Sequence, residues 1–113
     1  TATSKDSLEI KNWTKALHRK GVDFPYINLL KGMVGYCLTA AGSIESVATV
    51  LQLKEQFISP NINCEVVLTD LSSLISEEKI PKKLVETKVT IAIKASFGFG
   101  DVNGCVIFKT YLA

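Results

Sequence analysis

Three side chains in one short segment are able to take part in chemistry. Lys31, Tyr36 and Glu45 lie in the run Lys-Gly-Met-Val-Gly-Tyr-Cys-Leu-Thr-Ala-Ala-Gly-Ser-Ile-Glu, which spans residues 31–45. A tyrosine hydroxyl donates a hydrogen bond, but its pKa of about 10 makes it a poor base near neutral pH. A glutamate on an apolar helix needs a partner, so we expect Lys31 and Glu45 to form an ion pair. Such a pair suits a structural role and a functional role equally.

A second segment, Ala-Ser-Phe-Gly-Phe-Gly-Asp-Val-Asn over residues 95–103, places Phe99 between two glycines. Gly98 and Gly100 give the backbone conformations that are closed to other residues. One interpretation is a mobile turn that carries Phe99. The other is that Phe97 and Phe99 fill the core beneath a tight turn.

Both segments resemble signature motifs of the β-ketoacyl synthases. Residues 31–45 are similar to the family pattern Lys-Ser-Met-x-Gly-His-x-x-x-Ala-Ala-Gly-x-x-Glu, and residues 95–103 are similar to Asn-Ser-Phe-Gly-Phe-Gly-Gly-x-Asn. The resemblance extends from Thr1 to about Tyr111 and corresponds to the C-terminal quarter to third of a ketosynthase. It implies an α/β, thiolase-like layered fold (α-β-α-β-α), of which residues 1–113 form part of the C-terminal half. We therefore expect a fragment without the N-terminal half, and the absence of a methionine at Thr1 agrees with that expectation.

The resemblance also implies roles for the residues of the first segment. Enzymes of this family join an acyl group held on a cysteine to malonyl on an acyl carrier protein, and two histidines stabilise the charge that develops on the thioester oxygen. Lys31 matches the family lysine, and Glu45 matches the glutamate that helps to organise it. Tyr36 stands where the second histidine is found. These three positions are therefore degenerate catalytic positions, and no residue of the chain is assigned a certain catalytic role.

In the second segment, the resemblance implies that Phe99 is the phenylalanine that gates the acyl pocket, flanked by Gly98 and Gly100. Asp101 stands where glycine is usual, which is expected to alter how the turn closes. No metal site is expected, and no cofactor is expected to bind tightly. The phosphopantetheine arm of an acyl carrier protein is the expected carrier of the substrate.

Loss of a catalytic histidine is a feature of chain-length factors, the inactive partners of ketosynthases in type II polyketide synthases. The first hypothesis is therefore a chain-length-factor-like subunit of polyketide or fatty acid biosynthesis. Its expected partners are the N-terminal half of the fold, a ketosynthase subunit in a heterodimer (or a second copy in a homodimer) and an acyl carrier protein. The alternative is an active 3-oxoacyl-[acyl-carrier-protein] synthase, an acyltransferase in which Tyr36 supplies the hydrogen bond. A small α/β binding module without acyl chemistry is the third hypothesis.

The composition sets further limits. The 113 residues are 47% hydrophobic and 21% charged, and the mean hydropathy of +0.24 is high for an independent domain, so we expect another polypeptide to cover apolar surface. The net charge of +2 gives no strong field for nucleic acid. No apolar run reaches the roughly 18 residues of a membrane span, and a cytoplasmic location is expected. Cys37, Cys64 and Cys105 have neither zinc-site nor disulfide spacing, which favours buried free thiols.

The hydrophobic pattern predicts the elements that position these residues. It predicts an amphipathic helix over residues 6–20 with His18 at the surface, a buried strand over 26–30 that ends at Lys31, and an interior helix over 43–54. Residues 58–63 are expected to be extended, and residues 66–85 irregular with a short helix near 71–76. Two adjacent antiparallel strands are predicted over residues 88–95 and 104–111.

Overall fold

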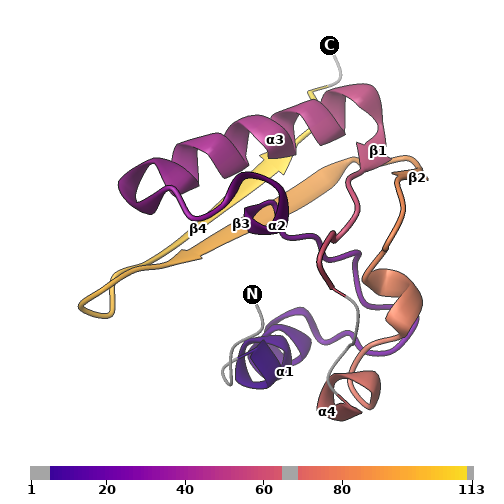
Figure 1. The fold of residues 1–113 in the computed structure, drawn as a ribbon. Coiled ribbons are helices and arrows are strands. Elements are labelled where there is room, and N and C mark those ends of the chain that lie inside the picture. The colour runs from indigo at the N-terminus through magenta and orange to yellow at the C-terminus, as the bar shows by residue number, and fades with distance from the viewer. Residues whose placement is uncertain (1–5, 65–68, 112–113) are drawn as a thin grey trace.

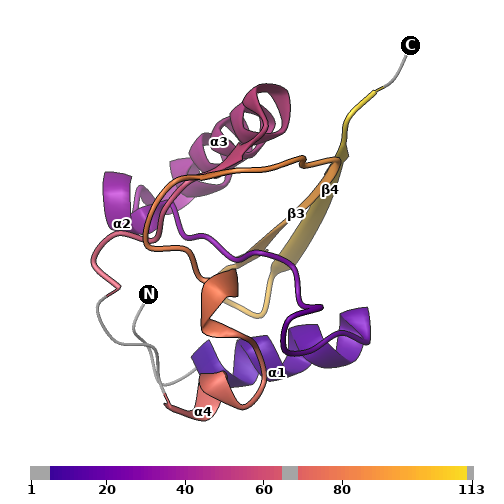
Figure 2. The same ribbon diagram turned by 90° about the vertical axis from the view of Figure 1, so that its right-hand side faces the viewer.

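The computed structural model describes residues 6–64 and 69–111. The elements in chain order are α1 (Asp6–Leu17), α2 (Lys31–Val34), the 3-10 helix η1 (Leu38–Ala40), α3 (Ala41–Glu55), β1 (Phe57–Ile58), α4 (Thr69–Ser72), the 3-10 helix η2 (Glu77–Lys79), β2 (Val85–Glu86), β3 (Ile91–Phe97) and β4 (Asn103–Lys109). Helix α3 lies along the β3–β4 hairpin, whereas α1 and α4 lie together at the end of the molecule remote from α3 (Figures 1 and 2).

The β3–β4 hairpin confirms the prediction of two adjacent antiparallel strands. Its register runs from Ile91 opposite Lys109 to Phe97 opposite Asn103. Strand β3 begins later and continues further than predicted, because the backbone stays paired through Phe97 and reverses only beyond it. The turn is closed by the Gly98 amide, which donates to the Val102 carbonyl at 2.8 Å. The hairpin thus holds the second signature segment at the tip of the sheet.

Helix α3 confirms the predicted helix over 43–54 and extends it by a few residues. It ends at Glu55, and the residue that follows, Gln56, has a φ of 58° in the left-handed region. The helix was expected to be interior, yet only Leu53 of its residues is buried within the described structure. Val47 is 62% exposed and Val50 is 48% exposed. The apolar side chains on the face that turns away from the hairpin are therefore uncovered.

Helix α1 is helical from Asp6, the first described residue, and ends at Leu17, three residues before the predicted end. The reason is His18, whose φ of 52° leaves the helical region. The prediction that His18 lies at the surface is confirmed.

The prediction of a strand over residues 26–30 is wrong. In the described part of the chain no strand pairs with this segment, and Lys31 is the first residue of α2 rather than the end of a strand. Buried Asn61 replaces a strand partner: its Oδ1 accepts from the Leu29 amide at 2.8 Å, and its Nδ2 donates to the Ile27 carbonyl at 2.8 Å. Side-chain hydrogen bonds therefore satisfy backbone groups that a ladder would otherwise satisfy.

The segments between α3 and β3 were predicted only in outline. Of the predicted extended run over 58–63, only Ile58 is in a strand, which pairs with β2. The short helix expected near 71–76 is instead α4 at Thr69–Ser72, followed by the turn η2. Residues 65–68 lie outside the described residues.

The buried apolar core of the described residues is small, and its members are Phe24, Leu53, Ile58, Leu71 and Ile75. The chain exposes 8189 Å² of accessible surface. A compact folded monomer of its 12.3 kDa mass is expected to expose only about 6,100 Å². The excess of about 2,100 Å² (8189 minus about 6,100) is larger than the roughly 800 Å² that each partner buries in a standard interface.

The outward face of the hairpin carries part of this exposed apolar surface. Ile91, Ile107 and Phe97 share the side of the sheet that faces away from α3 and are 55%, 66% and 58% exposed.

The cysteines differ from expectation, since all three are free but none is buried, and Cys105 is exposed. Among the described helices, none has the length and apolar character to cross a membrane.

Candidate functional site

The predicted ion pair between Lys31 and Glu45 is confirmed. Lys31 Nζ lies 2.6 Å from Glu45 Oε1, and the two side chains are 26% and 14% exposed. Glu45 lies in the first turns of α3, whereas Lys31 begins α2, so the pair joins two helices that the turn η1 connects. The pair is partly buried, at the end of α3 that is nearest the tip of the hairpin (Figure 1).

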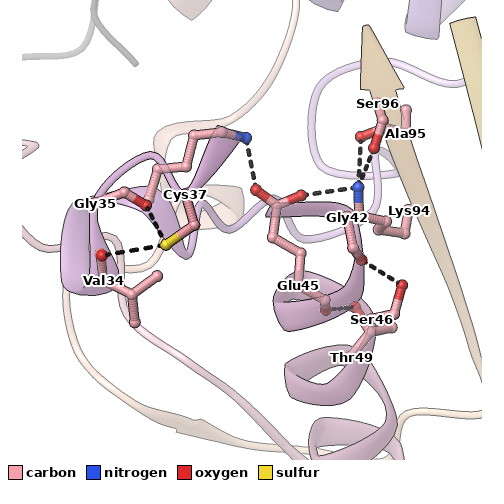
Figure 3. A network of polar contacts seen from close by, with 11 residues as sticks. Val34, Gly35, Cys37, Gly42, Glu45, Ser46, Thr49, Lys94, Ala95 and Ser96 are labelled. Atoms are coloured by element: carbon pink, nitrogen blue, oxygen red, sulfur yellow. Dashed lines mark hydrogen bonds and ion pairs between the residues drawn. The ribbon is translucent and has the colours of Figure 1, made fainter. Parts of the chain in front are cut away.

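A second lysine, which the sequence did not single out, completes the network. Lys94 Nζ lies 2.8 Å from Glu45 Oε2, and the Lys94 side chain is only 9% exposed. Figure 3 shows the carboxylate of Glu45 pointing toward the ammonium group of Lys94, which also contacts Ser96 and Ala95. Lys94 Nζ donates to the Ala95 carbonyl at 3.4 Å and contacts Ser96 Oγ as well.

The sequence did contain a signal for Lys94. In β3, alternate residues Ala92, Lys94 and Ser96 share one face, and a lysine in the middle of an apolar strand is unusual unless it is paired. The strand period places it toward α3, where Glu45 provides the opposite charge. A buried cation beside a predicted buried carboxylate was therefore the pairing to look for.

Two lysines share one carboxylate, and this arrangement sets the ionisation of Glu45. Burial raises the pKa of Glu45, but the hydrogen bonds and positive charges of Lys31 and Lys94 outweigh it, so that the pKa lies below its ordinary value of 4.5. Glu45 is therefore ionised at neutral pH. The three groups carry a formal net charge of +1.

Tyr36, at the position of the family's second histidine, lies beside this network. Its ring centroid is 5.7 Å from Lys31 Nζ, within range of a cation–π contact, and the side chain is 57% exposed. The neighbouring Cys37 thiol makes only long contacts of 3.8 and 3.9 Å, to the Val34 and Gly35 carbonyls. The exposed phenol hydroxyl can donate a hydrogen bond outward.

Phe99 lies at the tip of the hairpin and is 92% exposed. The alternative in which Phe97 and Phe99 fill the core is therefore wrong for the described chain. Gly100 has a φ of 74°, as expected of a glycine that permits the turn, whereas Gly98 keeps an ordinary backbone and closes the turn through its amide. Asp101, in the place of a glycine, also adopts the left-handed region, with a φ of 59°.

Gly32 departs from the serine of the family pattern, and the structure gives a physical reason. A Cβ atom at this position would lie 2.8 Å from the Ile62 carbonyl oxygen. The backbone that follows Lys31 thus passes closer to the 57–64 segment than any side chain permits. This close approach holds the start of α2 against the segment that follows α3.

The Glu45 carboxylate thus links the first signature segment to Lys94, the residue that precedes the second. Lys31, Tyr36 and Glu45 come together, while Phe99 lies at the far end of the turn that follows Lys94 and makes no described contact with them. Among the described residues, no group of histidine, cysteine, aspartate and glutamate side chains is arranged to hold a metal ion.

Comparison with known proteins agrees with the family resemblance. The family model described as "Beta-ketoacyl synthase, C-terminal domain" matches residues 1–65. A 3-oxoacyl-[acyl-carrier-protein] synthase 2 from Vibrio harveyi is 36% identical over 104 residues, which are 92% of this chain and 24% of that protein. A putative mitochondrial 3-oxoacyl-[acyl-carrier-protein] synthase from Schizosaccharomyces pombe is 33% identical over 107 residues, 95% of this chain and 24% of that protein. The chain thus spans about a quarter of the length of these relatives.

The solved structures give the same result. A chain in the structure of a type II polyketide synthase acyl-carrier protein, in complex with its ketosynthase bound to the hexaketide, matches with a TM-score of 0.69 and 32% identity. The match covers 80% of this chain and 21% of that chain. The fold is therefore α/β and corresponds to the C-terminal part of the thiolase-like ketosynthase fold. From the matched domain and the shared fold we conclude that this chain belongs to the β-ketoacyl synthase family.

Proposed function

We propose that this chain is part of a chain-length-factor-like subunit, which pairs with an active ketosynthase and shapes the cavity in which the acyl chain grows. The observation that carries the proposal is Tyr36 at the position of the second family histidine. Removal of one donor that stabilises a developing oxyanion typically lowers the rate about 100 to 1000-fold. A phenol is also bulkier than an imidazole and would intrude on the malonyl carbonyl.

The exposed apolar surface supports association with further polypeptide. The uncovered face of α3 and the outward face of the β3–β4 hairpin both carry large apolar side chains, such as Val47 and Ile107. We propose that the N-terminal half of the same fold covers part of this surface. A partner ketosynthase completes the assembly as a heterodimer, in a cytoplasmic setting.

An acyl carrier protein is the proposed source of substrate. The relatives are named as synthases that act on this carrier, and the solved structure contains one in complex with its ketosynthase. In the proposed assembly the phosphopantetheine arm delivers the acyl chain past the Phe99 turn. The Lys31–Glu45 pair supports the segment beside it.

The alternative is an active 3-oxoacyl-[acyl-carrier-protein] synthase with a variant site. The retained ion pair of Lys31 with Glu45 favours it, because this is the part of the family's signature that organises the site. In this case the Tyr36 hydroxyl supplies the hydrogen bond to the thioester oxygen. The catalytic cysteine would then lie in the upstream sequence.

The two candidates are separated by an assay of the full-length subunit. It is incubated with acyl and malonyl carrier protein, without any partner ketosynthase. We expect no β-ketoacyl product above background, both for the wild type and for Tyr36→His, because the upstream cysteine is expected to be absent as well. Formation of the product by the wild type at ordinary enzymatic rates would refute the chain-length-factor proposal and establish the alternative.

A further inference from the structure

We propose that Lys94 is a positioning residue that couples the Phe99 turn to the segment of Lys31 and Tyr36, with Glu45 as the link. The inference deepens the proposed function, because it identifies what holds the gate of the acyl pocket in relation to the rest of the site. Of the quantities measured in the test below, only the length of the product depends on the proposed function.

The first part of the coupling is that the two oxygens of the Glu45 carboxylate contact different lysines. Oε1 contacts Lys31 at 2.6 Å, and Oε2 contacts Lys94 at 2.8 Å, so each oxygen has its own cation. A carboxylate held at both oxygens by charge-assisted hydrogen bonds cannot rotate without losing one of them. Lys94 therefore fixes the direction in which Glu45 presents its other oxygen to Lys31.

The second half is the attachment of Lys94 to the end of its own strand. Its ammonium group contacts the Ala95 carbonyl at 3.4 Å and the Ser96 hydroxyl (Figure 3). Ser96 is separated only by Phe97 from Gly98, whose amide closes the turn by donating to Val102 at 2.8 Å. A shift of the Lys94 ammonium group would thus move Ser96 and, through the short segment that follows, Gly98, where the turn begins.

The start of α3 and the end of β3 lie near one another. A Cβ atom placed on Gly42 would lie 4.0 Å, an ordinary van der Waals distance, from Ser96 Oγ. Because Gly42 has no side chain, it makes no contact with Ser96 there, and the described link between the two elements is the 2.8 Å ion pair of Lys94 with Glu45.

The burial of Lys94 indicates that its ammonium group has a structural role. One cation suffices to neutralise Glu45, and Lys31 already provides it. A second cation that is 9% exposed adds the cost of removing a charge from water, which an apolar side chain of similar volume would avoid. What the ammonium group adds is a defined direction for both the carboxylate and the strand end.

The test uses the full-length subunit, purified with the polypeptides with which it associates. The variants are Lys94→Met, Glu45→Gln and the double variant, with Lys88→Met as the control, since Lys88 is exposed and lies outside the strands, before β3. Hydrogen–deuterium exchange is measured for the amides of residues 98–102 and, as a check of general folding, for α1.

We expect Lys94→Met and Glu45→Gln each to raise exchange in the turn by about tenfold, the effect of losing one charge-assisted hydrogen bond. The double variant should raise it no further than either single variant, because both remove the same link. The control should leave it unchanged. If Glu45→Gln leaves exchange in the turn at the wild-type level, or if the two effects add, the coupling through Glu45 is refuted.

If Lys94→Met also raises exchange in α1, the variant has disturbed the fold as a whole, and Lys94→Arg is then the test. Arginine retains the charge and the donors, so exchange in the turn should remain near the wild-type level, and a tenfold rise in this variant would overturn the inference. In the assembly with a ketosynthase, Lys94→Met should also change the distribution of product lengths, whereas Lys88→Met should not. If exchange changes but product length does not, the proposed function fails while the coupling stands.

Discussion

Replacement of Glu45 with glutamine tests the ion-pair network most directly. The change retains the size of the side chain but removes the charge that Lys31 and Lys94 contact at 2.6 and 2.8 Å. Lys94 is 9% exposed and would remain as a buried cation without a counter-charge, which costs about 3–5 kcal/mol. Lys31 is 26% exposed, so its pair is nearer the 0–1 kcal/mol of a surface pair. The glutamine oxygen still accepts one hydrogen bond, worth about 1 kcal/mol, and the expected net loss is about 3 kcal/mol in the free energy of unfolding.

The pH dependence of this loss identifies its origin. The pKa of Glu45 is lowered in the folded state, so its contribution to stability is fully present above the ordinary value of 4.5 and is lost as the pH falls through the lower, folded value. The difference in the free energy of unfolding between wild type and Glu45→Gln should therefore be constant from pH 8 to about pH 5. It should shrink below pH 4.5.

Urea unfolding of the full-length protein, followed by circular dichroism at several pH values, measures the difference. Glu55→Gln is the matched control, because Glu55 is in the same helix and its side chain is 57% exposed in a 3.6 Å pair with Lys54. This control should change the free energy of unfolding by less than about 1 kcal/mol. An equal effect of both variants, or a Glu45→Gln effect that persists undiminished in acid, would refute the reasoning.

Three further predictions concern the backbone around the site, and each is measured as the free energy of unfolding in urea. Gly32→Ser, which restores the family's residue, should destabilise the fold by about 1–3 kcal/mol, because its Cβ would lie 2.8 Å from the Ile62 oxygen. The control Gly104→Ala should be nearly neutral, because its Cβ would meet nothing within 4 Å. Equal effects of the two variants would contradict this account. Gly100→Ala should cost about 1–2 kcal/mol because φ is 74°, and a neutral result would show that the turn relaxes. Asn61→Ala should cost about 1–3 kcal/mol by leaving buried backbone groups unpaired, and no loss would mean that water replaces it.

The sequence predicted the elements whose pattern is local. The antiparallel hairpin and the helix that contains Glu45 follow from period and β-branched content, and the Lys31–Glu45 pair follows from the need of a carboxylate for a partner. The strand over 26–30 was wrong because its apolar run does not specify a partner, and Asn61, more than 30 residues away in the chain, satisfies its backbone instead. Lys94 was missed for the same reason, since its partner is distant in sequence.

The roles assigned to Tyr36, Phe99, Gly98 and Gly100 stay predictions, because they come from the family motif and from no contact within the described chain. The sequence also led us to expect Phe99 on a turn or in the core. The structure places it at the exposed tip, since Gly100 and Asp101, both in the left-handed region, allow the chain to reverse there. Tertiary context decided between alternatives that local pattern left open.

The outward face of the β3–β4 hairpin has a consequence for thermodynamics. A separate polypeptide that covered Ile91, Phe97 and Ile107 would bind the folded chain and find no equivalent site on the unfolded one. It would stabilise the fold by RT ln(1 + [L]/Kd), or about 2.7 kcal/mol at a concentration of 100 times Kd. The melting temperature of the chain would then rise with the concentration of that polypeptide. Mutations on this face would change stability by weakening an association equilibrium rather than by opening a cavity.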